Sequence, residues 1–246
     1  MGMKENRLDG LAIPKHVAFI MDGNGRWARA KGKKRTTGHR EGSRTLKNIC
    51  KVAYELGVEY VTVYAFSTEN WKRSDEEVAF LMRLLRQYLK ESVQEAEKNN
   101  MRIKVIGHIE GLPRDIQDKI ELLEKVSIQY DGLKLQIALN YGGRDEIVRA
   151  IKKINHELET DVLQHSDINE DLVSRYLDTS GIPDPDLMIR TSGEVRLSNF
   201  LLWQLAYTEF YFTEKYWPDF DKNALEDAII KYNETERRFG GLADET

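Results

Sequence analysis

The 246-residue sequence holds one cysteine, Cys50, and only five prolines, and it has no long hydrophobic run. A single cysteine excludes an internal disulfide and a zinc site built from several thiolates. No apolar stretch approaches the roughly 20 residues that a membrane-spanning helix needs. The polar residues before Lys15 contain no signal-peptide core. We therefore expect a cytoplasmic protein whose contact with a membrane, if it makes any, is peripheral.

The chain has 37 Lys and Arg residues against 41 Asp and Glu residues, a net charge of −4 that argues against a general nucleic-acid-binding protein. The charge is unevenly distributed. Between Arg26 and Lys47 lie nine basic residues and one acid, Glu41, which makes this segment +8. The remaining 28 basic and 40 acidic residues give −12. The sequence therefore predicts a concentrated cationic site on an otherwise acidic protein.

Short β-branched and aromatic runs alternate with amphipathic stretches, which is the pattern of an α/β fold. The predicted strands span residues 17–22, 60–66, 102–107, 133–141, 187–190 and 208–212. The predicted helices span residues 42–56, 75–99, 114–126, 144–158, 169–177 and 221–238, with Ser74 as the N-cap of the second and Glu77 three residues later. Because no linker or repeat interrupts the pattern, we expect a single domain with a mainly parallel six-stranded sheet flanked by helices.

The carboxyl ends of parallel strands meet at one edge of a sheet, where α/β proteins bind their ligands. Residues 22–27 (DGNGRW) follow the first predicted strand, and their two glycines let backbone N–H groups approach an anion. Arg26 adds a donor fork suited to phosphate. Asp22 beside a phosphate implies a divalent cation such as Mg²⁺ between the two. An ordinary glycine turn is the alternative interpretation.

Three further segments carry side chains that suit an anion. Residues 38–42 (GHREG) are predicted to begin a helix, and residues 66–73 (FSTENWKR) follow the second strand. Residues 190–198 (RTSGEVRLS) place two arginines around a glycine turn, as in a diphosphate clamp, and Glu209 offers a second carboxylate. Exposed charges, a capped turn and structural ion pairs are the respective alternatives. No Walker P-loop and no suitably placed GxGxxG occurs, so the diphosphate need not belong to a nucleotide.

The chain contains, in this order, HVAFIMDGNGRWA, GHREG, YAFSTENWKR, NYGGR, PDLMIRTSGEVRLSNFLLWQ, AYTEFYF and WPDF followed by RRFGG. Together these segments resemble the cis-prenyltransferase family, in particular bacterial undecaprenyl diphosphate synthases. The resemblance runs from about His16 to Gly241. It implies one catalytic domain over residues 16–241, a flexible N-terminal segment over 1–15, a tail over 242–246, and a hydrophobic tunnel in the fold.

The resemblance implies a Mg²⁺-dependent transferase of prenyl groups that works as a homodimer. Such an enzyme elongates an allylic diphosphate, usually farnesyl diphosphate, with isopentenyl diphosphate and releases inorganic diphosphate. Each new double bond is cis, so the product is a di-trans,poly-cis-polyprenyl diphosphate. The favoured product is undecaprenyl diphosphate, the precursor of the lipid carrier for cell-wall glycan such as peptidoglycan. The DDxxD motif of trans-prenyltransferases is absent from the sequence.

Matched residue by residue, Asp22 corresponds to the family's essential aspartate, which binds Mg²⁺ and helps the allylic diphosphate to leave. Asn70 corresponds to the position assigned to proton removal, although a carboxamide is a poor base and is better suited to position or relay the proton. Glu209 matches a second metal-linked carboxylate. The matched substrate-binding residues are Gly23, Asn24, Gly25, Arg26, Trp27, Arg35 and His39 for the allylic diphosphate, Arg190, Arg196, Leu197 and Ser198 for isopentenyl diphosphate, and Ser67, Thr68, Glu69, Trp71 and Arg73 in the loop after the second strand.

The resemblance also bears on the metal shell and on product length. Val195 stands where some members carry a histidine near the metal, so the Mg²⁺ shell should depend on Asp22, phosphate and water, with Glu209 less direct. The resemblance implies that the helix start that carries Glu77 is mobile and closes over substrate. The helix from Asp75 has no insertion of the kind found in longer-chain members. The matched tunnel residues are Ala65, Leu81, Leu84, Leu85 and Leu133, each of which is equally well a core residue.

Two alternatives stay open from the sequence. A non-catalytic subunit of a heteromeric prenyltransferase resembles the family but lacks the aspartate motif, which this chain keeps. A module that binds an anionic polymer would use the +8 segment, but the −12 elsewhere and glycines spaced for small phosphates argue against it. We therefore expect small diphosphates, and no nucleic acid, as partners.

Overall fold

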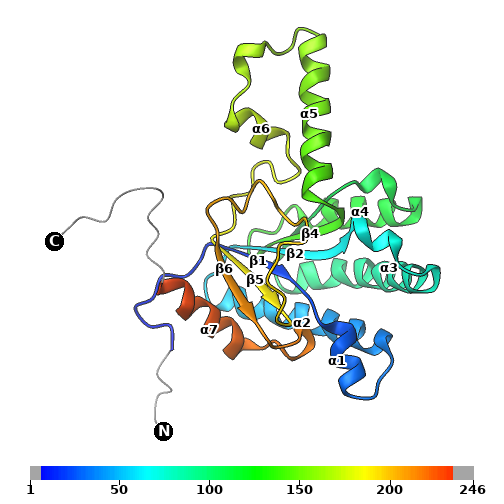
Figure 1. The fold of residues 1–246 in the computed structure, drawn as a ribbon, viewed down its shortest axis with the longest axis vertical. Helices are drawn as coiled ribbons and strands as arrows, with labels where there is room; N and C mark the ends of the chain where they lie inside the picture. The colour runs from blue at the N-terminus through cyan, green and yellow to red at the C-terminus, as the bar shows by residue number, and fades with distance from the viewer. Residues whose placement is uncertain (1–6, 235–246) are drawn as a thin grey trace, which may run out of the picture. The chain divides into compact units, whose positions relative to one another are not determined.

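The computed structural model describes residues 7–234, which form six strands and seven α-helices (Figure 1). The strands are β1 (His16–Ile20), β2 (Tyr60–Ser67), β3 (Arg102–Ile106), β4 (Lys134–Tyr141), β5 (Leu187–Thr191) and β6 (Glu209–Thr213). The helices are α1 (Asn24–Ala30), α2 (Arg35–Glu55), α3 (Asp75–Lys98), α4 (Arg114–Ser127), α5 (Gly143–Glu159), α6 (Glu170–Tyr176) and α7 (Lys222–Asn233). Short 3-10 helices include η1 (Thr68–Lys72) and η4 (Trp217–Asp219).

The strands form a six-stranded sheet in the order β3-β4-β2-β1-β5-β6. The pairs β1–β5, β5–β6 and β3–β4 are parallel. All five side chains of β1 and of β5 are buried, as expected for parallel strands that are covered on both faces. The prediction of an α/β fold with a mainly parallel six-stranded sheet flanked by helices is confirmed.

The chain groups into two compact units, which we describe separately. Among the described residues, unit 1 comprises 7–61, 185–195 and 205–234, and unit 2 comprises Thr62–Asp184 and Arg196–Gln204. The catalytic-domain boundaries at 16 and 241 stay a prediction. Among the described helices, none is both long and apolar enough to cross a bilayer.

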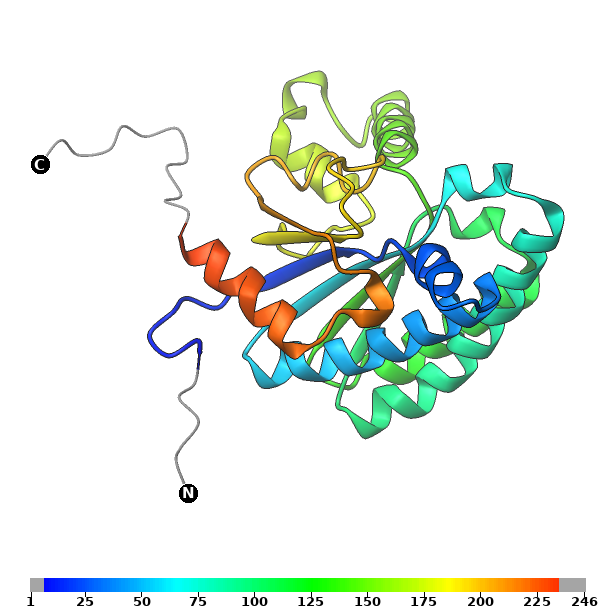
Figure 2. The same cartoon turned by 60° about the horizontal axis from the view of Figure 1, so that its bottom comes forward.

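The core of unit 1 contains three aromatic rings that join β1 to the segment before α7. Phe19 of β1 lies 5.6 Å from Trp217 and 6.0 Å from Phe220, and the latter two rings stack 5.6 Å apart. The indole Nε1 of Trp217 also donates to the carbonyl of Gly42, 2.9 Å away. These contacts fix α2 beside η4, and Figure 2 shows α1 and α2 next to each other.

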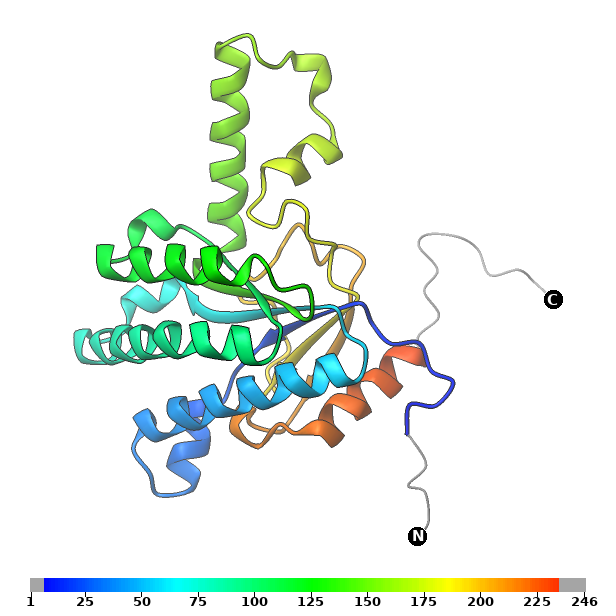
Figure 3. The same ribbon diagram turned by 180° about the vertical axis from the view of Figure 1, so that it is seen from behind.

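In unit 2, α3 and α4 lie side by side (Figure 3). The buried face of α4 consists of Ile116, Ile120, Leu123 and Ser127. The predicted start of α3 is confirmed, because the Ser74 side chain accepts from the backbone N–H of Glu77.

The sequence predicted no helix over residues 22–27, for which an anion-binding loop and an ordinary glycine turn were the two interpretations, but residues 24–30 form α1, which is short and contains Gly25. One helix prediction needs correction. Helix α2 begins at Arg35 rather than at Gly42, so the GHREG segment lies within the helix and not at its start. The last helix ends at Asn233 in the described part of the chain, and its predicted end at residue 238 lies outside the described residues.

Candidate active site

Asp22 in unit 1 follows β1 and is held by charged and polar groups. Arg190 Nη2 of β5 lies 3.0 Å from Asp22 Oδ2, Arg26 Nη2 of α1 lies 3.2 Å from Oδ1, and the Gly23 N–H donates to Oδ1 at 2.7 Å. Burial alone would raise the pKa of Asp22, but the hydrogen bonds from Arg190 and Gly23 and the charge of Arg26 outweigh it and lower that pKa. Asp22 is therefore an ionised carboxylate at neutral pH.

The two arginines beside Asp22 differ in their surroundings. The Arg190 side chain is 4% exposed, whereas that of Arg26 is 36% exposed. Arg26 Nη1 also donates to the carbonyl of Ser192 at 3.2 Å and to Glu194 Oε1 at 2.9 Å. Three acceptors thus hold the guanidinium of Arg26 while part of it faces solvent, where it can meet an anion.

The backbone around Asp22 leaves no room for larger residues. Gly23 has φ +97, and a Cβ there would lie 2.7 Å from Tyr216 and 2.9 Å from Ser192 Oγ. A Cβ on Gly38 of α2 would lie 1.9 Å from the backbone oxygen of Asn24 in α1. These close approaches need glycine, and they bring the predicted residues of α1 and α2 together.

Trp27, Arg35 and His39 are placed by the same helix pair. Trp27 is 6% exposed and its Nε1 donates to Asp219 Oδ1 at 2.7 Å. The ammonium of Lys31 lies 4.3 Å from the centre of the Trp27 ring, so this lysine packs on the indole. Arg35 is exposed and its side chain runs past Gly25, whereas His39 is half-buried. Trp27 is thus a packed anchor for α1, with its indole nitrogen already bonded.

The donor set at Asp22 fits one direct protein contact to Mg²⁺. Mg²⁺ is typically bound through one or two carboxylates, with water and phosphate oxygens completing the shell. Ser192 Oγ, which lies close to Gly23, is buried without a hydrogen-bond partner among the described residues, so it offers a polar contact to a hydrated ion or a phosphate. Asn24 Oδ1 is also buried without such a partner, but it faces Gly42 of α2. Within residues 7–234, no group of three or more His, Cys, Asp or Glu side chains is arranged to hold a metal.

Glu209 does not share this site within unit 1. Glu209 pairs with Leu187 at the amino end of β5, whereas Arg190 pairs with Ile20 three residues further along, and Asp22 follows Ile20. At about 3.3 Å per residue, Glu209 is displaced from Asp22 by at least about 10 Å along the strands. Ligands of one Mg²⁺ lie about 2.1 Å from the ion. Asp22 and Glu209 of one chain therefore do not bind the same ion.

The segment after β2 lies in unit 2, and its side chains bond within the segment and to neighbouring parts of that unit. Asn70 Oδ1 accepts from the Ser67 N–H at 3.1 Å, and this bond caps the amino end of η1. Trp71 is 40% exposed, packs at 5.1 Å against Phe66 and donates from Nε1 to Asn140 Oδ1 at 2.8 Å. The engaged oxygen of Asn70 agrees with a positioning role rather than with that of a base.

The charged residues of this segment are also paired. Arg73 Nη1 lies 2.7 Å from Glu77 Oε1 at the start of α3. Burial would raise the pKa of Glu69, but hydrogen bonds from Asn199, from the backbone and from the hydroxyls of Ser67 and Thr68 lower it. Glu69 is therefore ionised and directed at protein donors.

The loop that holds Arg196, Leu197 and Ser198 belongs to unit 2 as well. Arg196 and Ser198 are exposed and Leu197 is half-buried. Behind the loop, Phe200 is buried and stacks on Tyr64 at 4.6 Å. The exposed guanidinium and hydroxyl are accessible to a ligand on a loop that is anchored by an aromatic contact.

The expected tunnel positions fall into two groups in unit 2. Leu133 is 2% exposed and is a core residue. Ala65 is exposed, and the remaining three, all on α3, are half-buried: Leu81, Leu84 and Leu85. These four keep apolar surface that a prenyl chain could contact, so the tunnel stays a prediction for them.

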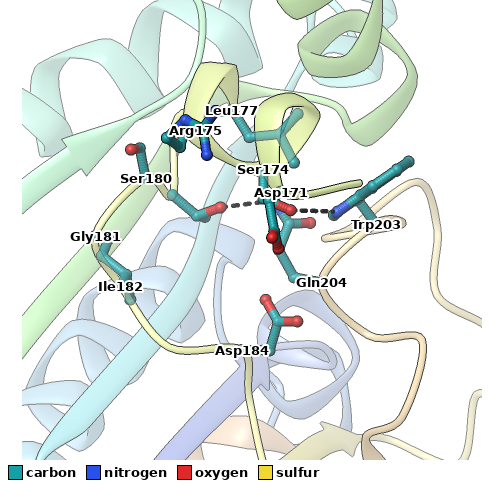
Figure 4. Close-up of a pocket in the computed structure, with 11 residues that line it drawn as sticks. Asp171, Ser174, Arg175, Leu177, Ser180, Gly181, Ile182, Asp184, Trp203 and Gln204 are labelled. Carbon is teal, nitrogen blue, oxygen red and sulfur yellow. Dashed lines mark hydrogen bonds between the residues drawn. The ribbon is translucent and has the colours of Figure 1, made fainter. Parts of the chain in front are cut away.

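A separate pocket of about 290 Å³ in unit 2 contains none of the predicted site residues (Figure 4). Trp203 Nε1 donates to Ser174 Oγ at 3.0 Å at its wall, and Gln204 Nε2 donates to Thr179 Oγ1 at 2.9 Å. Gln204 continues into a buried network through Glu146, whose carboxylate accepts from Tyr141 at 2.6 Å. This polar network supports the fold beside α5.

Comparison with known proteins decides the family. The family model of undecaprenyl diphosphate synthases matches residues 20–240, most of the chain. The protein belongs to this family. An isoprenyl transferase of Clostridium tetani is 50% identical over 236 residues, which is 96% of this chain and 92% of the relative. An isoprenyl transferase of Treponema denticola is 50% identical over 226 residues, covering 92% of this chain and 97% of the relative.

Two solved structures of similar proteins differ in their named products. Lavandulyl diphosphate synthase from Lavandula x intermedia, in complex with dimethylallyl diphosphate, is 40% identical, with a TM-score of 0.89 over 93% of this chain and 98% of that one. A probable undecaprenyl diphosphate synthase from Campylobacter jejuni is 35% identical, with a TM-score of 0.78 over 94% and 100% of the two chains. Membership of the undecaprenyl diphosphate synthase family therefore fixes the chemistry more closely than the product.

Sequence reasoning missed residues that hold this family member's site together. Glu194 and the Ser192 carbonyl bind Arg26, and Asn199 links three segments of unit 2. Ser192 lies within residues 190–198, which the sequence singled out, and Asn199 follows directly in the matched segment PDLMIRTSGEVRLSNFLLWQ, so the signal was present. Their partners are distant along the chain, and for that reason their roles required the structure.

Proposed function

We propose that the protein is a cis-prenyltransferase that condenses isopentenyl diphosphate onto farnesyl diphosphate and makes undecaprenyl diphosphate, a lipid-carrier precursor for cell-wall glycan. The observation that carries the proposal is the ionised Asp22 between Arg26 and Arg190, in a family of prenyl diphosphate synthases. Two arginines beside one carboxylate suit a diphosphate with its divalent cation. In this proposal the protein is a cytoplasmic homodimer, and its contact with the membrane is peripheral and made through the apolar chain of the lipid product.

In this proposal, residues of unit 1 bind the allylic diphosphate. Arg26 and the backbone of Gly23–Gly25 hold the phosphate oxygens, with Arg35 and His39 on α2. Mg²⁺, bound by Asp22, would neutralise charge on the leaving diphosphate. As the C–O bond of the allylic substrate breaks, the electron pair leaves with the diphosphate.

The second substrate would use the other predicted residues. Arg190, Arg196 and Ser198 bind isopentenyl diphosphate, whose double bond attacks the allylic carbon. The proton that the adduct then loses passes to diphosphate or to solvent. The Ser67 N–H donates to Asn70 Oδ1 and so holds the Asn70 side chain in place. In this proposal Asn70 therefore orients the reacting group and does not act as the base. Trp71 and Arg73 complete the segment after β2.

The test is incorporation of radiolabelled isopentenyl diphosphate with farnesyl diphosphate and Mg²⁺, with product length read by mass spectrometry. We expect labelled polyprenyl diphosphate from the purified protein and a loss of orders of magnitude in rate for Asp22→Ala. Asp118→Ala is the matched control, because Asp118 pairs with Arg114 at 2.9 Å on an exposed face of α4. No product from wild type, or full activity of Asp22→Ala, would refute the proposal.

The same experiment separates the alternatives. Activity of the purified chain alone excludes a non-catalytic subunit. A short product would shift the proposal from undecaprenyl diphosphate towards a smaller prenyl diphosphate. A separate filter-binding assay at low salt tests the remaining alternative, because tight, salt-dependent binding of nucleic acid would favour a polyanion-binding module.

A further inference from the structure

Asn199 in unit 2 has an unusual backbone conformation directly after the predicted substrate ligand Ser198. Its φ is +64, and Ser198 has φ +50. Residues other than glycine seldom adopt this left-handed region, and asparagine is among those that tolerate it best. Such a conformation persists when surrounding contacts fix it, and it is concentrated at functional sites.

Three hydrogen bonds hold Asn199 in place. Its carbonyl accepts from the Gly143 N–H at 2.7 Å, and its Oδ1 accepts from the Arg144 N–H at 2.9 Å, both at the start of α5. Its Nδ2 donates to Glu69 Oε1 at 2.9 Å, in η1. One side chain therefore joins the loop of Ser198 to α5 and to the segment after β2.

The loop of Ser198, the start of α5 and the segment after β2 pack closely around Gly142. A Cβ on Gly142 would lie 2.7 Å from Asn199 Nδ2 and 2.8 Å from Thr68 Oγ1. No side chain at position 142 could fit between them without moving one. The junction is thus tightly packed around the Asn199 amide.

Glu69 faces this junction rather than a ligand. Its carboxylate receives hydrogen bonds from Asn199, from the hydroxyls of Ser67 and Thr68, and from the backbone. A carboxylate with its lone pairs used in this way, and with a negative charge, is a poor partner for a diphosphate.

We propose that Asn199 is a positioning residue, which acts through Glu69 to fix the loop of Ser198 relative to the segment 67–73 and so sets the geometry in which isopentenyl diphosphate binds. This inference rests on the proposed function, and it assigns Glu69 a linking role in place of substrate binding. It predicts that the KM for isopentenyl diphosphate depends on the hydrogen bond between the two side chains, and not on the identity of either residue by itself.

The test exchanges donor and acceptor across the Asn199–Glu69 bond. Asn199→Asp keeps the acceptor for Arg144 and the tolerance for positive φ, but it sets two carboxylates against each other. We expect the KM for isopentenyl diphosphate to rise by about tenfold or more, with a smaller change in kcat. Glu69→Gln should act more weakly, because its amide oxygen still accepts from Asn199.

The double variant Asn199→Asp with Glu69→Gln restores a bond, since the glutamine amide introduced at position 69 can donate to the new carboxylate. We expect its KM to lie within about threefold of that of Glu69→Gln, a strongly non-additive result. Asn155→Asp is the matched control, because Asn155 Nδ2 donates to Glu159 Oε1 at 2.8 Å on an exposed face of α5. This control should leave KM unchanged.

Native-state amide exchange gives a readout that needs no catalysis. Exchange over residues 67–71 should accelerate in Asn199→Asp and slow again in the double variant. If wild type makes no prenyl product but exchange responds in this way, the proposed function fails and the linkage stands. Unchanged KM and exchange in Asn199→Asp, or a double variant no better than that single one, would overturn the inference.

Discussion

Replacing Asp22 by asparagine tests whether its charge is structural, catalytic or both. The substitution keeps the shape of the side chain but removes the partner of Arg190, whose side chain is 4% exposed. Loss of one partner from a buried ion pair costs about 3–5 kcal/mol. The Asp22 side chain is 30% exposed and that of Arg26 is 36% exposed, so solvent screens part of this. We expect the free energy of unfolding to fall by about 1–3 kcal/mol.

The same substitution should separate binding from rate. Arg26 and Arg190 lose a competing carboxylate, so inorganic diphosphate should bind Asp22→Asn at least as tightly as wild type when Mg²⁺ is chelated. The rate of isopentenyl incorporation should nevertheless fall by about a thousandfold or more, which corresponds to about 4 kcal/mol of lost transition-state stabilisation. Urea unfolding, isothermal titration calorimetry and steady-state assays measure the three quantities.

The pH dependence of stability gives an internal check. Because the pKa of Asp22 is lowered in the folded protein, its stabilisation is present above the ordinary carboxyl pKa and is lost as pH falls through the folded value. The stability gap between wild type and Asp22→Asn should therefore close below about pH 4. Asp118→Asn, at an exposed pair, serves as control. Unchanged stability at neutral pH, or a loss of diphosphate affinity that matches the loss of rate, would refute this reasoning.

Three other substitutions or reactions test the structure. Gly38→Ala should lower the free energy of unfolding by about 3 kcal/mol or more, since the new Cβ would lie 1.9 Å from the backbone oxygen of Asn24. Gly25→Ala should lower it by less, because the new Cβ would meet only the Arg35 side chain, at 3.0 Å. Equal urea midpoints for the two variants would contradict this. Burial raises the pKa of Cys50 to about 12, so Ellman's reagent at pH 8 should label the thiol after unfolding only, and stoichiometric native labelling would count against its burial. Burial raises the pKa of Glu146, so wild-type stability should decline as pH rises through that pKa, and the decline should disappear in Glu146→Gln; identical pH profiles of the two proteins would show the reasoning to be wrong.

The sequence predicted the elements whose cause is local. Strand β1 is a continuous apolar run, and the Ser74 cap of α3 is encoded within four residues. Helix α1 could not be predicted in this way, because it is short and contains Gly25, and glycine is a poor helix residue. Its helical turn is supported by α2, where Gly38 lets the two backbones touch. That contact is a property of packing and leaves no local sequence signal.

The candidate site divides in the same manner. A motif match places Asp22 and Glu209 in one metal shell, but the strand register puts them at different ends of the strands of unit 1. Asp22 itself was predicted at a strand's carboxyl end, and its arginine partners were among the predicted residues. The family motifs thus identified which side chains suit a diphosphate and a metal ion. The strand register in the structure shows which of those side chains lie close enough to act together within one chain.

Residues with a strained, positive-φ backbone cluster in the predicted substrate loop and include the proposed positioning residue, Asn199. Of seven non-glycine residues with positive φ in the described chain, four lie between positions 192 and 201: Ser192, Ser198, Asn199 and Leu201. Each such conformation costs of the order of 1 kcal/mol and persists when other contacts hold it. Ser192 is held in unit 1 by its N–H bond to the Lys215 carbonyl at 2.8 Å, and Asn199 in unit 2 by its three bonds. Glycine at position 199 would relieve the strain there but would also remove the side chain that bonds to Arg144 and Glu69. The run from Arg190 to Asn199 therefore retains a costly backbone together with the contacts that hold it, which is the arrangement expected where ligand geometry, rather than stability, determines the sequence.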